Sequence, residues 1–269
     1  MKRIVKLNDG NMMPVIALGV WQSHEDTKEA VLCALRNGYR HIDTAACYNN
    51  EEAVGEAIKE SGIDREELFI TTKLWNDDIR AKRTREALEE SLRKLQLDYV
   101  DLYLLHWPVE GRVEAYLELE KLQKEGKIRS IGVSNFRKHH LEELMAQVNI
   151  IPAVNQMEYN PGMQDEEIRE YCKEQGIVLE AWSPLGSGAC LNDEVIKGIA
   201  DKYHKSVAQV ILRWLLQKDI VVLPKSVHEN RIIENSQLFD FELTDEDMNT
   251  MNSLNKFKRT GPDPDNFDF

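Results

Sequence analysis

The sequence predicts a (β/α)8 barrel, an α/β fold in which eight parallel strands alternate with helices. Short apolar runs rich in β-branched residues alternate with longer amphipathic stretches from residue 16 almost to the end of the chain, as in repeated βα units. The length of 269 residues is close to the roughly 250 residues of a typical barrel. No long Gly-, Ser- or Pro-rich linker divides the chain, so we expect residues 1–269 to form one domain.

Eight strands are predicted from the apolar runs, and each is followed by a predicted helix. Such a series closes into a barrel more naturally than into an open sheet. The strands are Val15–Gly19, Tyr39–Asp43, Leu68–Lys73, Tyr99–His106, Ile128–Ser134, Ala153–Gln156, Ile177–Trp182 and Ile220–Pro224. The helices are 25–37, 50–60, 80–95, 112–124, 137–146, 164–174, 206–216 and 229–237. Helix starts are expected at Asp26, Thr84 and Asp165, and helix ends at Gly38, Gly62, Gly126 and Gly176.

A tight turn is predicted before the first barrel strand. Ile4–Leu7 and Val15–Leu18 flank Asn8–Asn11, and the Asp-Gly pair in this segment favours a β-hairpin. We expect the hairpin to close the floor of the barrel. At the other end of the chain, Pro264–Phe269 either folds over the barrel mouth or has no fixed structure.

The composition excludes several classes of partner. The 34 Lys and Arg against 47 Asp and Glu give a net charge of −13, which argues against binding to nucleic acid. An apolar share of 42% argues against intrinsic disorder, and no apolar run suits a signal peptide or a membrane span. The four cysteines, Cys33, Cys47, Cys172 and Cys190, form no Cys-x-x-Cys pair, so we predict a location in the reducing cytoplasm.

Polar side chains occupy six of the predicted strand ends. Asp43, Lys73 and His106 end the second, third and fourth strands, and Tyr48 follows Asp43 by five residues. The fifth, sixth and eighth strands end in Ser134-Asn135, Asn155-Gln156 and Lys225-Ser226. One such residue alone would more often be a cap or a solvated loop residue. Because the carboxyl ends of barrel strands form one mouth, where active sites lie, the whole set favours a functional site.

Several motifs resemble those of the aldo-keto reductase family. They are Gly38–Glu51, Thr72–Trp75, Leu104–Pro108, Gly132–Phe136, Asn155-Gln156, and Pro224–Ser226 with Arg231 and Glu234-Asn235. The sequence is most similar to the short bacterial members, such as 2,5-diketo-D-gluconate reductases. The resemblance implies a (β/α)8 barrel enzyme that reduces aldehydes or ketones to alcohols with NADPH.

The four residue types near the strand ends suit carbonyl reduction. Hydride addition needs a proton donor for the oxygen that becomes negative, and the resemblance assigns this role to Tyr48. At a distance of about 4 Å and an effective dielectric of about 20, we expect the Lys73 ammonium to lower the pKa of the Tyr48 phenol by as much as about 3. Asp43 is expected to keep Lys73 charged and in place. His106 is expected to orient the carbonyl and hold its developing charge together with Tyr48.

A cofactor must supply the hydride, because no side chain donates one. No Gly-x-Gly-x-x-Gly follows any predicted strand, so the dinucleotide-binding fold that uses this motif is absent. In the resembling family a nicotinamide cofactor lies across the barrel mouth. The resemblance assigns Ser134, Asn135 and Gln156 to its carboxamide, and Trp182, where the family commonly has Tyr, to stacking on its ring.

The resemblance also predicts NADPH over NADH. Lys225, Ser226 and Arg231 match the positions that bind a 2′-phosphate, for which an ammonium and a guanidinium are suitable partners. The remaining cofactor positions implied by the resemblance are Glu234 and Asn235, beside the adenine, and Val20, Ser183 and Leu185.

Three tryptophans follow strand ends and are expected to form the wall of the substrate pocket. They are Trp21, Trp75 and Trp107, although Trp75 suits a role in capping the core equally well. The loops after His106 and over 183–193 are short, so we expect an open pocket and loose substrate choice. Aldehydes, α-dicarbonyls, keto sugars and ketones all remain open as substrates, and the resemblance favours a monomer.

Two other functions compete with this interpretation of the sequence. One is a metal-dependent hydrolase with Asp43, His106 and Glu158 as ligands, which would lack the paired histidines that such sites usually carry. The other is a nicotinamide-binding sensor or scaffold with little turnover. A pure binder has no physical need for all four catalytic residue types, so we predict an enzyme with no bound metal.

Overall fold

The structure, a computed structural model, describes residues 3–269 and has the architecture that the sequence predicts. The strands are β1 (Ile4–Lys6), β2 (Met12–Pro14), β3 (Leu18–Gly19), β4 (His41–Asp43), β5 (Phe69–Leu74), β6 (Val100–Leu105), β7 (Ile128–Ser134), β8 (Val154–Glu158), β9 (Val178–Trp182) and β10 (Val221–Val222). The helices are α1 (Thr27–Arg36), α2 (Glu51–Ser61), α3 (Asn76–Arg80), α4 (Thr84–Leu95), α5 (Arg112–Lys124), α6 (Lys138–Met145), α7 (Glu166–Glu174), α8 (Glu194–Tyr203), α9 (Val207–Gln217), α10 (Glu229–Ser236) and α11 (Asp245–Asn252).

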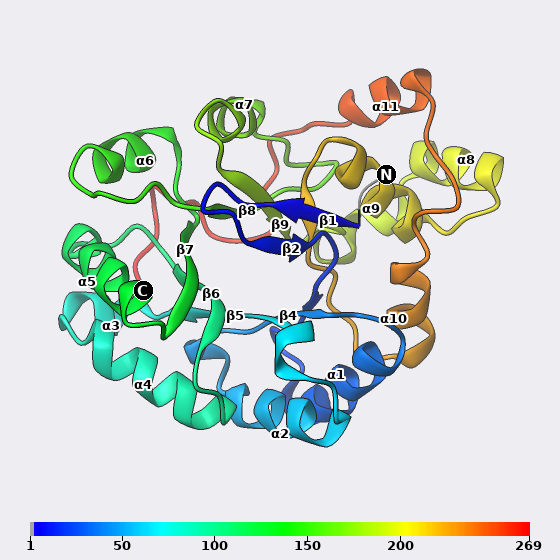
Figure 1. Ribbon diagram of the computed structural model, residues 1–269. Coiled ribbons are helices and arrows are strands. Elements are labelled where there is room, and N and C mark those ends of the chain that lie inside the picture. The colour runs from blue at the N-terminus through cyan, green and yellow to red at the C-terminus, as the bar shows by residue number, and fades with distance from the viewer. Residues whose placement is uncertain (1–2) are drawn as a thin grey trace.

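The strands β3 to β10 form one parallel sheet that closes on itself. They are hydrogen-bonded in sequence order from β3 to β10. The amide of Ala17 donates to the carbonyl of Val222 over 2.9 Å, and the amide of Gly19 donates to the carbonyl of Pro224 over 3.2 Å. These bonds place the first barrel strand beside the last. Figure 1 shows the helices around the outside of this barrel.

The hairpin that closes the floor differs in one strand from the prediction. Its second strand is β2, paired antiparallel with β1, and not Val15–Leu18, whose backbone is used in closing the barrel. Leu7 and Met13 are buried in one apolar cluster with side chains from the lower ends of the barrel strands, among them Phe69. Figure 1 shows the hairpin lying across one end of the strands, as expected for a floor.

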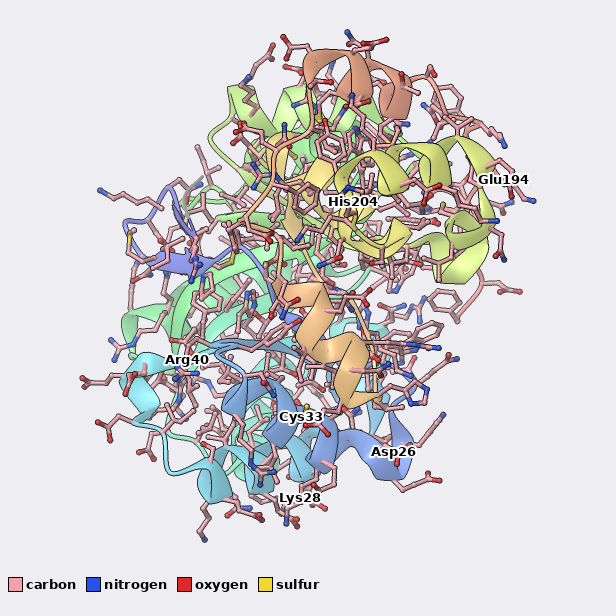
Figure 2. The ribbon with its side chains drawn as sticks, turned by 90° about the vertical axis from the view of Figure 1, so that its right-hand side faces the viewer. Asp26, Lys28, Cys33, Arg40, Glu194 and His204 are labelled. Atoms are coloured by element: carbon pink, nitrogen blue, oxygen red, sulfur yellow. The ribbon has the colours of Figure 1, made fainter. Side chains whose placement is uncertain are left out.

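The helix predictions hold for eight segments, and the described residues contain three further helices that were not predicted, α3, α8 and α11. The sequence does carry a signal for α8, namely Asp193, a residue type that caps helices. In the structure the Asp193 carboxylate accepts from the amides of Val195 (2.9 Å) and Ile196 (3.3 Å). Such a bond marks a helix start. The helix ends at Tyr203 and is capped by His204, which has a φ of 51°, and Figure 2 shows Glu194 and His204 at the two ends of the segment.

The predicted helix caps hold only in part. The Asp165 side chain accepts from the amide of Ile168 at 3.2 Å, as a capping residue does. Asp26 makes no capping bond, because the chain enters α1 through a 3-10 turn (His24–Asp26) and its backbone is already helical. Thr84 is the first residue inside α4 rather than its cap.

The barrel interior changes from apolar to polar along the strands. Below the mouth, the buried interior carries Asp43, Lys73, Gln156 and Glu180, each at most 4% exposed. Buried polar groups must be hydrogen-bonded or paired, so their mutual contacts decide the geometry of the mouth. In the described part of the chain, no helix is long and apolar enough to cross a bilayer.

Candidate active site

A cavity of about 870 Å³ opens at the carboxyl ends of the strands. The predicted site residues that line it are Trp21, Asp43, Tyr48, Trp75, His106, Trp107, Ser134, Asn135, Gln156, Trp182, Ser183, Leu185, Lys225, Ser226, Arg231, Glu234 and Asn235. Lys73 is fully buried and lies beneath the cavity. Val20 does not line it: its side chain is buried, and its carbonyl accepts a bond from the Asn50 amide at 2.9 Å. The structure therefore gives Val20 no contact with the cavity.

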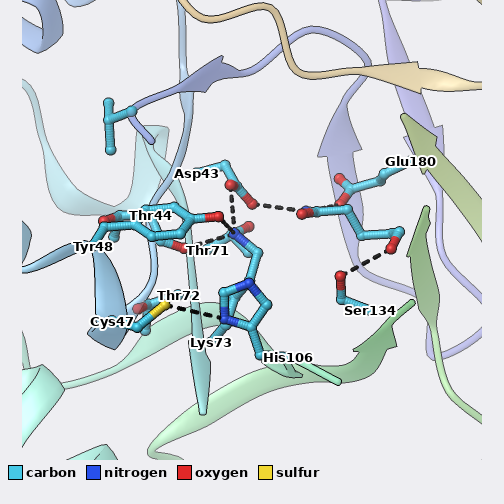
Figure 3. A network of polar contacts seen from close by, with 12 residues as sticks. Asp43, Thr44, Cys47, Tyr48, Thr71, Thr72, Lys73, His106, Ser134 and Glu180 are labelled. Carbon is cyan, nitrogen blue, oxygen red and sulfur yellow. Dashed lines mark hydrogen bonds and ion pairs between the residues drawn. The ribbon is translucent and has the colours of Figure 1, made fainter. Parts of the chain in front are cut away.

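Lys73 holds the centre of the cavity floor. Its Nζ donates to Asp43 Oδ1 at 2.6 Å and to the Thr44 carbonyl at 2.8 Å, and it lies 3.5 Å from Tyr48 Oη. The three donors of the ammonium thus meet three oxygen atoms, as Figure 3 shows. This arrangement points one of the ammonium protons at the phenol.

The electrostatics of Tyr48 differ from the expectation. Burial disfavours the phenolate and outweighs the attraction of the Lys73 ammonium, so the pKa of Tyr48 is raised to about 12. Lys73 is itself next to the Asp43 carboxylate, which compensates much of its charge. For Lys73, burial is the largest single influence and opposes the ammonium, but Asp43, Tyr48 and Glu180 together outweigh it and raise the pKa. Lys73 therefore lowers the Tyr48 pKa in the predicted direction, but burial, which the prediction left out, raises it by more.

His106 is a neutral imidazole with a partner that the sequence did not reveal. Burial and the nearby Lys73 charge hold the pKa of His106 well below its usual range. The Cys47 sulfur lies 3.6 Å from His106 Nδ1, and burial raises the pKa of this thiol to about 12. Because the thiol keeps its proton, it can donate to Nδ1, which leaves Nε2 as the protonated nitrogen. The only sequence signal for Cys47 is its position directly before Tyr48.

The residues assigned to the carboxamide are linked by hydrogen bonds. Ser134 Oγ donates to the Gln156 carbonyl at 2.9 Å, and Asn135 Nδ2 donates to Ser134 Oγ at 3.1 Å. Trp182 Nε1 donates to Asn135 Oδ1 at 2.9 Å. Asn135 has a φ of 65°, a left-handed conformation that Asn tolerates better than most residues. The chain thus turns directly after β7 with the Asn135 side chain at the cavity.

The far end of the cavity is positive. Lys225 and Arg231 are exposed and make no salt bridge with any residue in 3–269. Ser226 is buried, and its Oγ accepts from the amide of His228 at 3.1 Å. Glu234, also at this end, is held by a hydrogen bond from Ser206 Oγ. Two unpaired cations beside a hydroxyl can bind an anionic group such as a phosphate.

The C-terminal segment folds over the cavity, which decides between the two expectations for it. The Phe269 ring is parallel to the Trp75 ring at 5.8 Å, and Phe267 lies 4.9 Å from Trp107 between ring centres. Arg80 Nη2 donates to the Phe269 carbonyl at 2.8 Å. The segment therefore covers part of a mouth that the short loops leave uncovered, so the pocket is less open than predicted.

Glu158 anchors the start of this segment. Its Oε1 accepts from the Thr260 amide at 2.6 Å and from Thr260 Oγ1 at 2.7 Å. The next residue, Gly261, lies so close to Trp182 that an added Cβ would be 2.3 Å from the ring. Neither contact had a signal in the sequence, because Glu158 and Thr260 are 102 residues apart and Trp182 and Gly261 are 79 residues apart.

The ligand set of the hydrolase hypothesis is not assembled. Among residues 3–269, the cluster close enough to share an ion is His139, His140 and Asp265, whose candidate ligand atoms lie within 4.8 Å of one another. Asp265 is paired there with the Arg137 guanidinium. Asp43 and His106 face the cavity floor, whereas Glu158 holds Thr260. The three proposed ligands therefore do not form a metal site.

Comparisons with known proteins agree with this geometry. Residues 15–256 match the model of the Aldo/keto reductase family. The chain is 56% identical over 268 residues to a glyoxal reductase of Bacillus subtilis, covering 98% of this chain and 97% of that protein. It is 50% identical to a methylglyoxal reductase of Escherichia coli, covering 98% of each. An aldo-keto reductase of Bombyx mori, solved in complex with NADP, has a TM-score of 0.92 and 40% identity over 97% of this chain and 95% of that one. The chain therefore belongs to the aldo/keto reductase family.

Proposed function

We propose that the protein reduces small carbonyl compounds, α-dicarbonyls in particular, to alcohols with NADPH. The observation that carries the proposal is the group of Tyr48, Lys73, Asp43 and His106 at the floor of one cavity. Such a group can donate a proton to an oxygen that becomes negative and can stabilise its charge. The similarity to a glyoxal reductase and a methylglyoxal reductase supports α-dicarbonyls as the substrate class.

In the proposed mechanism, Tyr48 is the general acid. The nicotinamide, when bound, supplies the hydride. The alcohol that forms is a weak acid, comparable with water, whose pKa is about 15.7. The Tyr48 phenol, with its pKa of about 12, is a stronger acid and can therefore give its proton to the oxygen of the product. The ammonium of Lys73 then stabilises the phenolate that remains. Asp43 holds Lys73 in position through the 2.6 Å bond.

His106 is proposed to orient the substrate carbonyl. A neutral imidazole protonated at Nε2 can donate one hydrogen bond to the carbonyl oxygen, in addition to the bond from Tyr48. The thiol of Cys47, 3.6 Å from Nδ1, favours this tautomer. The Cys47 thiol therefore decides which of the two His106 ring nitrogens carries the proton.

The cavity suits a dinucleotide phosphate. Its volume of about 870 Å³ lies within the range of cofactor sites. We propose that Ser134, Asn135 and Gln156 bind the carboxamide and that Trp182 packs on the nicotinamide ring. Lys225, Ser226 and Arg231 would bind the 2′-phosphate, and Glu234 and Asn235 the adenine, with Ser183 and Leu185 between the two ends.

The substrate end of the cavity is lined by aromatic side chains. Trp75, Trp107 and Phe269 line it, and their rings contact one another. Trp21, 54% exposed, is at the rim. Aromatic walls of this kind are typical of a pocket for a small organic substrate.

The function is tested by NADPH oxidation with a panel of carbonyls. We expect glyoxal and methylglyoxal to give higher kcat/KM values than bulky aryl ketones, measured from the loss of NADPH absorbance. Tight NADPH binding with no oxidation by any member of the panel would reject the proposal and favour a nicotinamide-binding sensor.

Removing the Arg231 charge is expected to weaken NADPH but not NADH. Arg231→Gln should raise the KM for NADPH by about 10- to 150-fold, the effect of losing one charge-assisted bond of roughly 1.5–3 kcal/mol. The KM for NADH should not change, because NADH has no 2′-phosphate. Lys59→Gln, which removes an exposed charge on α2, is the control. An equal effect on both cofactors would contradict the assignment.

The oligomeric state, the location and the partners of the protein also belong to the proposal. We propose a monomer that works in the cytoplasm on a small-molecule substrate, with no nucleic acid partner. The four cysteines are free, which suits a reducing compartment, and the net charge of −13 disfavours nucleic acid. Sedimentation at several protein concentrations tests the monomer.

A further inference from the structure

A second carboxyl group lies inside the barrel, on β9. The Glu180 side chain is fully buried, and its residue is in register with Gln156 on β8 and with Val221 on β10. Figure 3 shows Glu180 across the barrel from Lys73, on the far side of Asp43. Glu180 has no role in the proposed mechanism.

Glu180 is joined to the catalytic group through one amide. Gln156 Nε2 donates to Asp43 Oδ2 at 2.8 Å and to Glu180 Oε2 at 3.0 Å. Asp43 Oδ1 in turn accepts from Lys73, which faces Tyr48. A continuous series of hydrogen bonds thus runs from Glu180 to the phenol.

The charges around Glu180 favour its protonated form. The charged groups that face it are the Asp43 carboxylate from β4 and the Lys73 ammonium from β5, while β8 presents an amide and β10 a valine. Lys73 is hydrogen-bonded to Asp43 and not to Glu180. Burial and the Asp43 charge raise the pKa of Glu180 to about 8.

One oxygen of Glu180 has no partner. Within residues 3–269, Oε1 is buried and makes no hydrogen bond. An unpaired oxygen of a neutral acid costs far less free energy than one of a buried carboxylate. The lone oxygen therefore agrees with a protonated Glu180.

The bond to Glu180 fixes the orientation of the Gln156 side chain. Both of its amide hydrogens are directed to carboxyl oxygens, so its Oε1 is the atom left for a ligand in the cavity. An amide that is fixed in this way offers only an acceptor, which fits the NH2 group of a nicotinamide carboxamide. Without Glu180, one amide hydrogen would lose its acceptor and the side chain could rotate.

We propose that Glu180, as a neutral carboxylic acid, is a positioning residue that fixes the Gln156 amide toward the cofactor and preserves the Lys73–Asp43 pair. Ionisation of Glu180 would add a second negative charge beside Asp43, compete for the Lys73 ammonium and make Tyr48 a weaker acid. The part concerning the cofactor and Tyr48 rests on the proposed function, whereas the protonation state does not.

The protonation state is tested on the protein without cofactor. Infrared difference spectra recorded across a pH titration should show the C=O band of a protonated carboxylic acid, lost with a midpoint near pH 8. The band should be missing from Glu180→Gln. Glu51→Gln is the matched control, because Glu51 is also buried but bonds Thr72 outside the catalytic group.

The positioning role is tested by NADPH binding and by pH profiles. Glu180→Gln keeps an acceptor for Gln156, so it should leave the NADPH Kd and the rate at neutral pH close to wild type. We expect the kcat of wild type to decrease near pH 8 as Glu180 ionises, and the kcat of Glu180→Gln to lack this decrease. Glu180→Leu removes the acceptor and should raise the NADPH Kd, measured from tryptophan fluorescence, by about tenfold.

The outcomes separate this proposal from the proposed function. If the Glu180→Gln spectrum retains the band, or if its pH profile equals that of wild type, the role of Glu180 is rejected even though the enzyme reduces carbonyls. If wild type reduces no carbonyl, the proposed function fails while the infrared result still decides the protonation state. Should Glu180→Leu fail to fold, the Glu180→Gln data alone decide.

Discussion

Tyr48→Phe is expected to lower kcat for carbonyl reduction by about 10²- to 10⁴-fold, the usual contribution of a general acid. The substitution removes one oxygen and keeps the ring, which lies edge-on to His106 with ring centres 5.8 Å apart. NADPH binding should not change, because the proposed cofactor contacts come from other residues. Stopped-flow measurement of NADPH oxidation with methylglyoxal, together with a fluorescence titration of NADPH, tests both statements.

The control for this variant is Tyr116→Phe. Tyr116 is fully buried on α5, and its hydroxyl has no hydrogen-bond partner among residues 3–269. Loss of this hydroxyl should leave kcat unchanged. A Tyr48→Phe protein that keeps more than a tenth of the wild-type rate would reject Tyr48 as the acid.

Lys73→Met is expected to reduce both activity and stability. The variant removes the cation that stabilises the Tyr48 phenolate, so kcat should decrease by a factor similar to that for Tyr48→Phe. It also leaves Asp43, whose side chain is 6% exposed, without its cation. Breaking a buried pair in this way costs about 3–5 kcal/mol of the free energy of unfolding, which urea denaturation measures.

A double variant separates these two effects. Asp43→Leu combined with Lys73→Met removes both charges, and replacing a buried pair by apolar residues is often neutral for stability. Part of the lost stability should return, reduced by the acceptor that Gln156 loses. Activity should not return. A double variant as unstable as Lys73→Met would show that the unpaired Asp43 charge is not the cause.

The strand ends could be predicted from the sequence because they depend on local pattern. An apolar run followed by a polar residue marks the point where a buried strand reaches the mouth, and Asp43 and His106 stand at such points. Gln156 does not, because β8 continues beyond it to Glu158. Parallel strands in a barrel bring those ends together whatever their distance along the chain. The resemblance to a family then added the roles of these residues.

The remaining parts of the site depend on contacts with no local signal. Glu180 is an interior position in the middle of an apolar run, and only the approach of β8 shows that it shares Gln156 with Asp43. Val20 shows the converse, because a motif position pointed to the cofactor while the fold buries its side chain.

The sequence by itself therefore determined the barrel, the order of its strands and which residue types stand at the mouth, because strand and helix periodicity are local properties of the chain. Only the tertiary structure decided the course of Phe267 and Phe269 over Trp75 and Trp107 and the rise of the Tyr48 pKa. Both depend on how completely water is excluded from groups far apart in the chain. That exclusion is a property of packing and is not encoded in any one segment.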